Sequence, residues 1–274
     1  MPPVLINLVA CFVAFGLLAR LTPCNPTTRP FVSRDMIDNA LYWFVGFLFF
    51  GDLATIYIKG AASLLGAGGP VAASDLLNGY GPASHLPLLV QAVLVIVVMD
   101  FVQYWLHRLF HTSWFWPFHA IHHSAEDLDW TTTYRIHPVN LAIYGVGALA
   151  IVHIGGFSAA AFLIVGPFNL VAGALVHANL DWTFGPLRLV IASPVYHRWH
   201  HVRDPAVHDR NFAPTFPVWD VLFGTCHMPR GELPQSYGAD DVPGNFVAQL
   251  GWPFVVTWRR LRARGPARVG APAV

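Results

Sequence analysis

Charged side chains are scarce in this sequence: of its 274 residues, 11% are charged and 55% are hydrophobic. A soluble domain carries about 25% charged residues, so the composition argues against a soluble globular protein. The net charge of +1 gives no reason to expect a nucleic-acid partner. Mean hydropathy is +0.49, and together these values predict an integral membrane protein.

Cysteine and lysine are also rare. Cys11, Cys24 and Cys226 lie far apart and form no Cys-x-x-Cys pair, so we expect neither a disulfide framework nor a thiolate metal site. Lysine occurs once, at Lys59, and we interpret the excess of arginine as a composition bias of the genome. The apolar run near the start has no basic segment before it and no cleavage site after it, which predicts a retained membrane helix.

Long apolar runs, by contrast, are abundant. A helix needs about 20 mostly apolar residues to span the hydrocarbon of a bilayer. Five windows meet or nearly meet this length, namely Val4–Leu21, Asn39–Ile58, Leu86–Leu106, Val139–Gly156 and Phe157–Ala178. Only Gly155-Gly156 separates the last two windows, which predicts a helical hairpin.

Arginines are distributed unevenly between these windows. The segments after the first, third and fifth windows contain most of them, whereas the segment between the second and third contains only Lys59. Positive residues concentrate in the cytoplasmic loops of membrane proteins. The distribution therefore predicts an external N-terminus and a cytoplasmic C-terminus.

Three histidine clusters follow the third and fifth windows, on the predicted cytoplasmic side. They are His107 and His111, then His119, His122 and His123, and then His197, His200 and His201. Residues three and four apart share a helix face, so each cluster is able to aim all or most of its rings at one point. Converging neutral imidazoles form a transition-metal site, and eight rings exceed the needs of one ion. The clusters predict a pair of metals.

Two further histidines and one carboxylate lie near these clusters. His177 ends the fifth window at the same membrane face and is predicted to be a ninth ligand. His137 is predicted either to bind metal or to cap the helix that follows it. Asp100 either orients a ligand through a hydrogen bond or packs against another helix. Imidazoles suit zinc, copper, iron and nickel, and the spacing fits both oxygen-activating di-iron and hydrolytic zinc.

The order of these motifs resembles the fatty acid hydroxylase/sterol desaturase superfamily. The resemblance runs from about Val90 to Met228 and includes one His-x-x-x-His and two His-x-x-His-His clusters. Shorter matches lie at Asp100, Arg135-Ile136-His137-Pro138, Ser193-Pro194, Asn211-Phe212 and Trp219-Asp220-Val221-Leu222-Phe223-Gly224-Thr225. The three residues between His107 and His111 are similar to the sterol-desaturase-type members.

This resemblance implies a non-haem di-iron centre that uses O2 and two electrons on lipid C–H bonds. The implied ligands are His107, His111, His119, His122, His123, His177, His197, His200 and His201, and His137 stays a further candidate from its position. We expect an external electron donor of the ferredoxin or cytochrome b5 type, and an apolar lipid substrate that arrives from the bilayer.

The predicted function is hydroxylation or desaturation of a sterol-like, fatty acyl or other apolar lipid. Three alternatives stay open: cleavage of a lipid ether or aldehyde on the same centre, a haem-binding or metal-transporting membrane protein, and a hydrolytic di-zinc enzyme.

The predicted fold class is all-α, a polytopic bundle of about four to five membrane helices with a histidine-rich catalytic cap on the cytoplasmic face. We divide the chain into N-terminal membrane helices with a connector (1–86), a catalytic domain (87–230) and a cytoplasmic tail (231–274).

Overall fold

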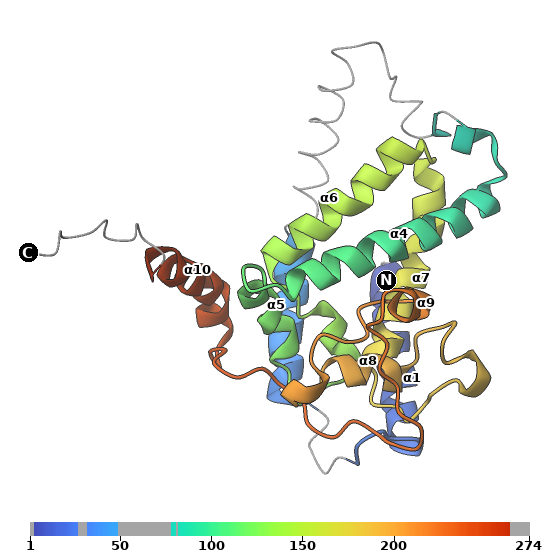
Figure 1. Cartoon of the computed structure of the whole chain (residues 1–274). Coiled ribbons are helices and arrows are strands. Elements are labelled where there is room, and N and C mark those ends of the chain that lie inside the picture. The colour runs from blue at the N-terminus through green and yellow to red at the C-terminus, as the bar shows by residue number, and fades with distance from the viewer. Residues whose placement is uncertain (1–2, 27–31, 49–77, 81, 264–274) are drawn as a thin grey trace, which may run out of the picture.

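The computed structural model describes residues 3–26, 32–48, 78–80 and 82–263 (Figure 1). These residues form helices joined by loops, with an isolated antiparallel bridge between Val202 and Tyr237 and no strand among them. The prediction of an all-α chain is confirmed. The elements in chain order are α1 (Pro3–Leu21), a helix over 34–48, η1 (Pro82–His85), α4 (Leu88–Phe110), α5 (Trp116–His123), η2 (Trp130–Tyr134), α6 (Pro138–Gly155), α7 (Ala159–His177), η3 (Gly185–Leu187), α8 (Pro194–His200), η4 (Pro205–Val207), α9 (Val218–Leu222) and α10 (Phe246–Ala263).

The long helices α4, α6 and α7 pack together and extend from the end of the molecule that holds α5, α8 and α9 (Figure 1). Their contact is built from small and branched side chains, with Ala92 and Val95 of α4 against Ala161 and Val165 of α7. Small residues let helix backbones approach closely, which suits helices in a lipid environment.

A tight turn connects α6 to α7. Gly156 ends α6 with a left-handed φ of 65°, and a Cβ there would lie 1.8 Å from the carbonyl oxygen of Tyr80. The Ser158 hydroxyl then accepts a hydrogen bond from the backbone N–H of Ala161 and caps the start of α7. The turn lies where it was predicted, but from it α6 and α7 diverge and each packs against α4 (Figure 1).

The outer surface of the long helices is strongly apolar. Ile154 of α6 is 89% exposed and Leu163 of α7 is 78% exposed. Contiguous apolar surface of this kind marks contact with a membrane or a partner. In the described part of the chain, α4 and α7 are the helices long and apolar enough to cross a bilayer. The second predicted window lies partly outside the described residues, from 49 to 58.

Arg135 joins the N-terminal helix over 34–48 to the central part of the fold. Its side chain is 3% exposed and donates to the carbonyl of Ile121 at 3.1 Å and to the Asp35 carboxylate at 2.8 Å. It also donates to the Asn39 side chain at 3.3 Å. Because Ile121 lies in α5, this buried guanidinium holds the helix of the His-x-x-His-His cluster against its neighbour.

Arg135→Gln should therefore lower the stability of the fold. Removing one member of a buried ion pair leaves the other uncompensated and costs about 3 kcal/mol or more. We expect a lower unfolding midpoint in thermal denaturation of the purified protein in detergent. Arg230→Gln, at an exposed arginine, is the matched control and should unfold like the wild type; equal midpoints for both variants would contradict the role of Arg135.

Candidate metal centre

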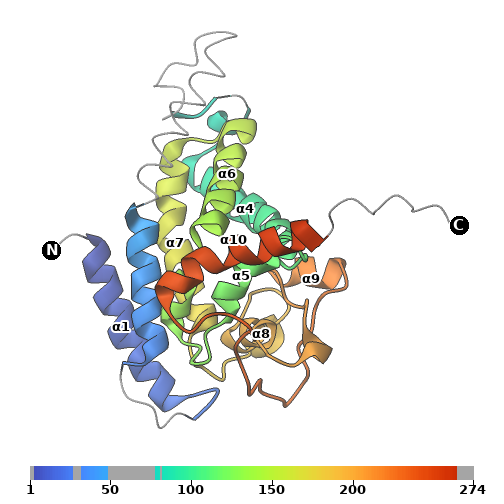
Figure 2. The same ribbon diagram turned by 90° about the vertical axis from the view of Figure 1, so that its left-hand side faces the viewer.

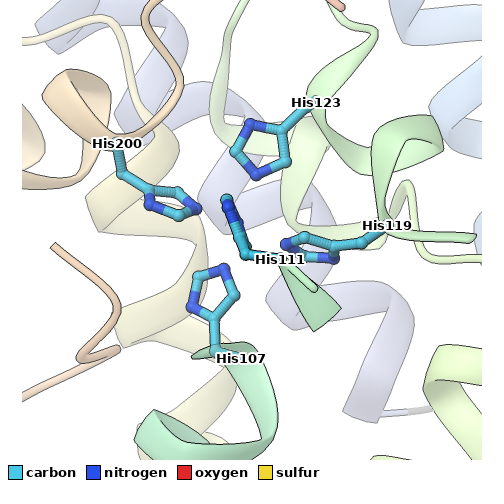
Figure 3. A group of neighbouring side chains, drawn as sticks. All are labelled: His107, His111, His119, His123 and His200. Atoms are coloured by element: carbon cyan, nitrogen blue, oxygen red, sulfur yellow. The ribbon is translucent and has the colours of Figure 1, made fainter. Parts of the chain in front are cut away.

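Nine histidines converge at the lower ends of the long helices and form two groups. Group one consists of His107, His111, His119, His123 and His200, and group two consists of His122, His177, His197 and His201. Within each group the ligand atoms lie within 4.8 Å of one another. Figure 3 shows the five rings of group one around a common centre, delivered from α4, α5 and α8.

Each His-x-x-His-His cluster divides its rings between the two groups. In α5 the outer pair His119 and His123 belongs to group one, while His122 belongs to group two. In and just after α8 the outer pair His197 and His201 belongs to group two, and His200 belongs to group one. Each motif thus aims most of its rings, two of three, at one group, as expected, and gives the third ring to the other group.

The groups lie next to each other. The ring centroids of His123 and His201 are 4.4 Å apart, and those of His119 and His122 are 5.3 Å apart. Histidines three and four residues apart on a helix point in slightly different directions. One turn of helix therefore reaches both groups. The arrangement suits two neighbouring metal ions.

Burial keeps the imidazoles of the short helices neutral. It lowers the pKa of His119, His123 and His200 well below the usual value, and the neighbouring histidines lower it further. Charged imidazolium has no lone pair for a metal, whereas neutral imidazole has one. At physiological pH these side chains are in the form that binds metal.

Backbone carbonyls decide which ring nitrogen carries the proton. The Nδ1 atom of His107 lies 2.7 Å from the Phe212 carbonyl oxygen, and that of His200 lies 2.6 Å from the Arg210 carbonyl. A carbonyl only accepts, so Nδ1–H donates and the Nε2 lone pair is free to point inward.

The inward nitrogens of group one are unsatisfied. Within the described residues, the Nε2 atoms of all five histidines of group one are buried and have no hydrogen-bond partner. Buried polar atoms are almost always paired, so five unpaired acceptors around one point require explanation. A metal ion held by these five nitrogens would provide it.

In group two, the short distances between ring nitrogens indicate a metal site. The Nε2 atom of His177 lies 3.2 Å from that of His122 and 3.0 Å from that of His197. His177 donates its Nδ1 proton to the Gly173 carbonyl at 2.7 Å, so its Nε2 has one lone pair for two neighbours. Nitrogens at right angles around one ion, each at about 2.1 Å, lie about 3.0 Å apart. The spacing fits metal ligands.

Gly173 lies one turn before His177 in α7. A Cβ at this position would lie 2.6 Å from the Thr133 hydroxyl oxygen, so the missing side chain lets Thr133 of η2 pack directly against α7. Gly173 and Thr133 both line the cavity of about 290 Å³ that touches the two groups.

One loop before α9 supports three ligands of group one. Besides the carbonyls of Arg210 and Phe212, it provides Asp209, whose carboxylate accepts from Nδ1 of His111 at 2.9 Å. Asp209 and Asn211 both have left-handed backbone, with φ of 59° and 56°. Such conformations in residues other than glycine persist where the surrounding structure holds them, often at functional sites.

Asp220 holds this loop in place. Its buried carboxylate accepts from the backbone N–H groups of Phe212 and Ala213, both at 2.8 Å, and from the hydroxyl of Thr225 at 2.7 Å. The Tyr196 hydroxyl also donates to it. Asp220 was visible in sequence only as part of a family match, because a carboxylate that binds backbone N–H groups leaves no periodic pattern.

Asp100 has the same kind of role. Its carboxylate accepts from the backbone N–H groups of Thr215 and Phe216 and from Nε1 of Trp219, at 2.7, 3.0 and 2.9 Å. Its partners belong to the segment that leads into α9, so it positions that segment instead of orienting a histidine directly. Of the two alternatives considered for Asp100, the structure therefore favours packing.

His137 lies outside both groups. Its Nδ1 accepts from the backbone N–H of Val139 and caps α6, while its Nε2 lies 3.2 Å from the Leu250 carbonyl oxygen of α10. Both ring nitrogens are occupied by backbone groups. The structure therefore favours the capping alternative for this residue over metal binding.

Two cavities reach the histidines from different sides. A cavity of about 290 Å³ touches both groups and has apolar walls that include Ile136, Leu141 and Val176, with the polar side chains Gln103 and Asn169. A second cavity of about 520 Å³ touches only group one, and its remaining lining is mostly polar, including Asp209 and Arg203. Group one is accessible from both an apolar and a polar side.

The comparisons with known proteins agree with this geometry. Residues 92–225 match the model of the fatty acid hydroxylase family. This matched segment contains all nine histidines. Ornithine lipid hydroxylase OlsE of Rhizobium tropici is 34% identical over 218 residues, 75% of this chain and 66% of the relative.

The chain belongs to the fatty acid hydroxylase/sterol desaturase superfamily. Alkylglycerol monooxygenase of Caenorhabditis elegans is 34% identical over 53% of this chain and 29% of its own length. Very-long-chain aldehyde decarbonylase GL1-6 of Oryza sativa subsp. indica is 29% identical over 53% of this chain and 24% of its own length. The matches span less than two thirds of each of these superfamily relatives. No solved structure matches the chain.

Asp209→Asn should weaken metal binding at group one. Asparagine tolerates the left-handed backbone but removes the negative charge beside His111, and such partners of metal-bound histidines contribute about tenfold or more to affinity. The measurement is a titration of the metal-loaded protein with a chelator. Of two metal equivalents per chain, one should be lost at a chelator concentration about tenfold lower than in the wild type. Asp240→Asn, in the same cavity, is the control; coincident curves for both variants and the wild type would contradict the assignment.

Proposed function

We propose that this chain is a membrane-bound, O2-dependent di-iron oxygenase that hydroxylates or desaturates a lipid. The observation that supports it most is the convergence of nine buried imidazoles into two adjacent groups of five and four. Membership of the superfamily and the names of the relatives, which describe a lipid hydroxylase and a monooxygenase, support the same reaction class.

Two iron ions would be held by the five histidines of group one and the four of group two. An all-imidazole donor set leaves the positive charge of the ions uncompensated, and imidazole is a common ligand of iron. When bound, the pair would supply O2 activation for attack on an unactivated C–H bond. The protein contributes ligand orientation and a shaped cavity.

The cavity of about 290 Å³ is the proposed substrate pocket, because it lies directly against both groups. Its apolar walls from α6 and α7 would take up the hydrocarbon part of a lipid and exclude water from the ions. The side-chain amides of Gln103 and Asn169 would orient a polar group of the substrate. A substrate from the bilayer would enter between the long helices that frame this pocket.

The proposed membrane arrangement follows from the long helices. Helices α4 and α7 cross the bilayer, and α1, α6 and the segment beginning at residue 39 complete a bundle of four to five spans. The distribution of arginine supports a cytoplasmic position for the histidine end. The division into 1–86, 87–230 and 231–274 is part of this proposal, with α10 as an ordered part of the last segment.

Electrons would come from a separate redox protein of ferredoxin or cytochrome b5 type. The polar cavity beside His111, His123 and His200 is the side on which group one approaches the aqueous surface. A donor on that side would not obstruct the apolar cavity. Substrate and electrons would thus reach the centre from different directions.

Cleavage of a lipid ether or a long-chain aldehyde is the second candidate. The monooxygenase and decarbonylase among the relatives favour it, because their names describe alkylglycerol and aldehyde substrates. The same metal centre and cavity would serve either reaction. The products separate the two candidates: an alcohol or alkene retains the carbon skeleton of the lipid, whereas cleavage shortens it.

The test is oxidation of a bacterial lipid extract by the protein in nanodiscs, loaded with ferrous iron and supplied with reductant and ¹⁸O2. We expect an iron- and reductant-dependent product, with labelled oxygen if it is an alcohol. His122→Ala removes one nitrogen of group two and should abolish turnover and lower the bound iron. A product formed without O2 and reductant would contradict the proposal.

His85→Ala is the matched control for this variant, because His85 is an exposed histidine in η1 and belongs to neither group. It should retain both iron and activity. Full turnover in His122→Ala would contradict ligation at that position, and equal membrane insertion of both variants shows that any loss is not a folding defect.

A further inference from the structure

Helix α10 has two unlike faces. The side toward the rest of the protein includes the buried Gln249 and Pro253. On the other side, Val247 is 76% exposed, Phe254 53%, Trp258 55% and Leu261 51%. The spacing of these four residues is seven, four and three, so they form one stripe along the helix.

The apolar stripe of α10 faces outward, which is the opposite of the orientation expected for a helix on an aqueous surface. A helix on an aqueous surface turns its apolar side inward and its polar side outward. In α10 the outward side holds large apolar residues, including a tryptophan, over the whole length of the helix. A continuous exposed apolar surface indicates that something apolar covers it.

Arginines accompany the apolar stripe at its C-terminal end. Arg259 and Arg262 are exposed, and the guanidinium of Arg262 lies 4.7 Å from the centroid of the Trp258 ring. The side chain of Arg260 is turned back and donates to the Ser113 carbonyl. Tryptophan with arginine beside an apolar face is the composition of helices that lie in the headgroup region of a membrane.

The orientation of α10 agrees with such a position. In Figure 2, α10 runs across the direction of α6 and α7, near the ends of those helices that lie closest to α5 and α8. Since α7 is long and apolar enough to span a bilayer, a helix that crosses it at this end lies along the membrane plane. Figure 1 agrees, with α10 beside the bundle and outside the packed long helices.

We propose that α10 lies in the membrane interface, with its apolar stripe in the acyl boundary and Arg259 and Arg262 on the headgroups of anionic phospholipids. Each arginine near an anionic surface strengthens such attachment about fivefold. The occupant of the stripe is therefore the bilayer itself. The inference uses the membrane location of the chain and is independent of the reaction proposed above.

Attachment of α10 would also support the metal centre. Phe254, which is 53% exposed, lies at the edge of the stripe, and its ring also contacts that of Phe118 in α5, with the centroids 5.3 Å apart. The Leu250 carbonyl is the partner of His137. At its start, Gln249 accepts from the Tyr42 hydroxyl at 3.2 Å. Helix α10 thus ties α5, which carries His119, His122 and His123, to the membrane surface.

Nitroxide labels on the full chain in nanodiscs test this position. In a Cys226→Ser background, which removes the partly exposed thiol, Leu261→Cys would carry the label on the stripe and Glu232→Cys would carry it on an exposed loop. We expect apolar O2 to relax the label at 261 more than a water-soluble nickel chelate does, and the reverse at 232. Equal nickel accessibility at both positions would overturn the proposal.

Charge and the competing occupant are tested with the same label. In nanodiscs containing phosphatidylglycerol, the double variant Arg259→Gln with Arg262→Gln should make the label at 261 more accessible to the nickel chelate. Without these substitutions, transfer to nanodiscs of pure phosphatidylcholine should have the same effect. No shift in either case would overturn the role of anionic lipid. Dipolar broadening between labels of two chains would instead identify a second copy as the occupant and overturn the proposal. Neither readout depends on iron or turnover.

Discussion

The position of the ring proton on His107, His200 and His177 is the constraint on which the rest of the site depends. A ring binds metal through Nε2 only when its proton sits on Nδ1, and a backbone carbonyl facing Nδ1 enforces that choice. Phe212, Arg210 and Gly173 supply such carbonyls. The protein therefore has to position main-chain atoms as carefully as it positions the histidines themselves.

This requirement explains two buried carboxylates that touch no reacting group. Asp220 and Asp100 accept backbone N–H groups from the segment between α8 and α9, and Asp100 also accepts from the Trp219 indole at the start of α9. The loop has little regular structure of its own, so its shape depends on these bonds.

Much of this architecture follows from local patterns in the sequence. Apolar length predicts the helices now seen in α1, α6 and α7, and Gly155-Gly156 predicts the turn between α6 and α7. Spacing of three and four identifies the histidines that the structure gathers. The division of each His-x-x-His-His cluster between two groups was not predictable, because it depends on the angle at which α5 and α8 meet. Asp209 and the accepting carbonyls were not predictable either, since tertiary contacts alone bring them to the rings. The sequence predicts only a cytoplasmic tail for the segment that holds α10, because the outward direction of its apolar face depends on how α10 packs against α5.

The division of the two clusters has a consequence for any attempt to alter one metal position alone. Helix α5 delivers neighbouring side chains to both centres, and α8 does the same from the opposite side. A rotation or shift of either helix therefore moves rings of both groups together. The two groups are mechanically coupled, so a substitution that changes the position of one helix alters both.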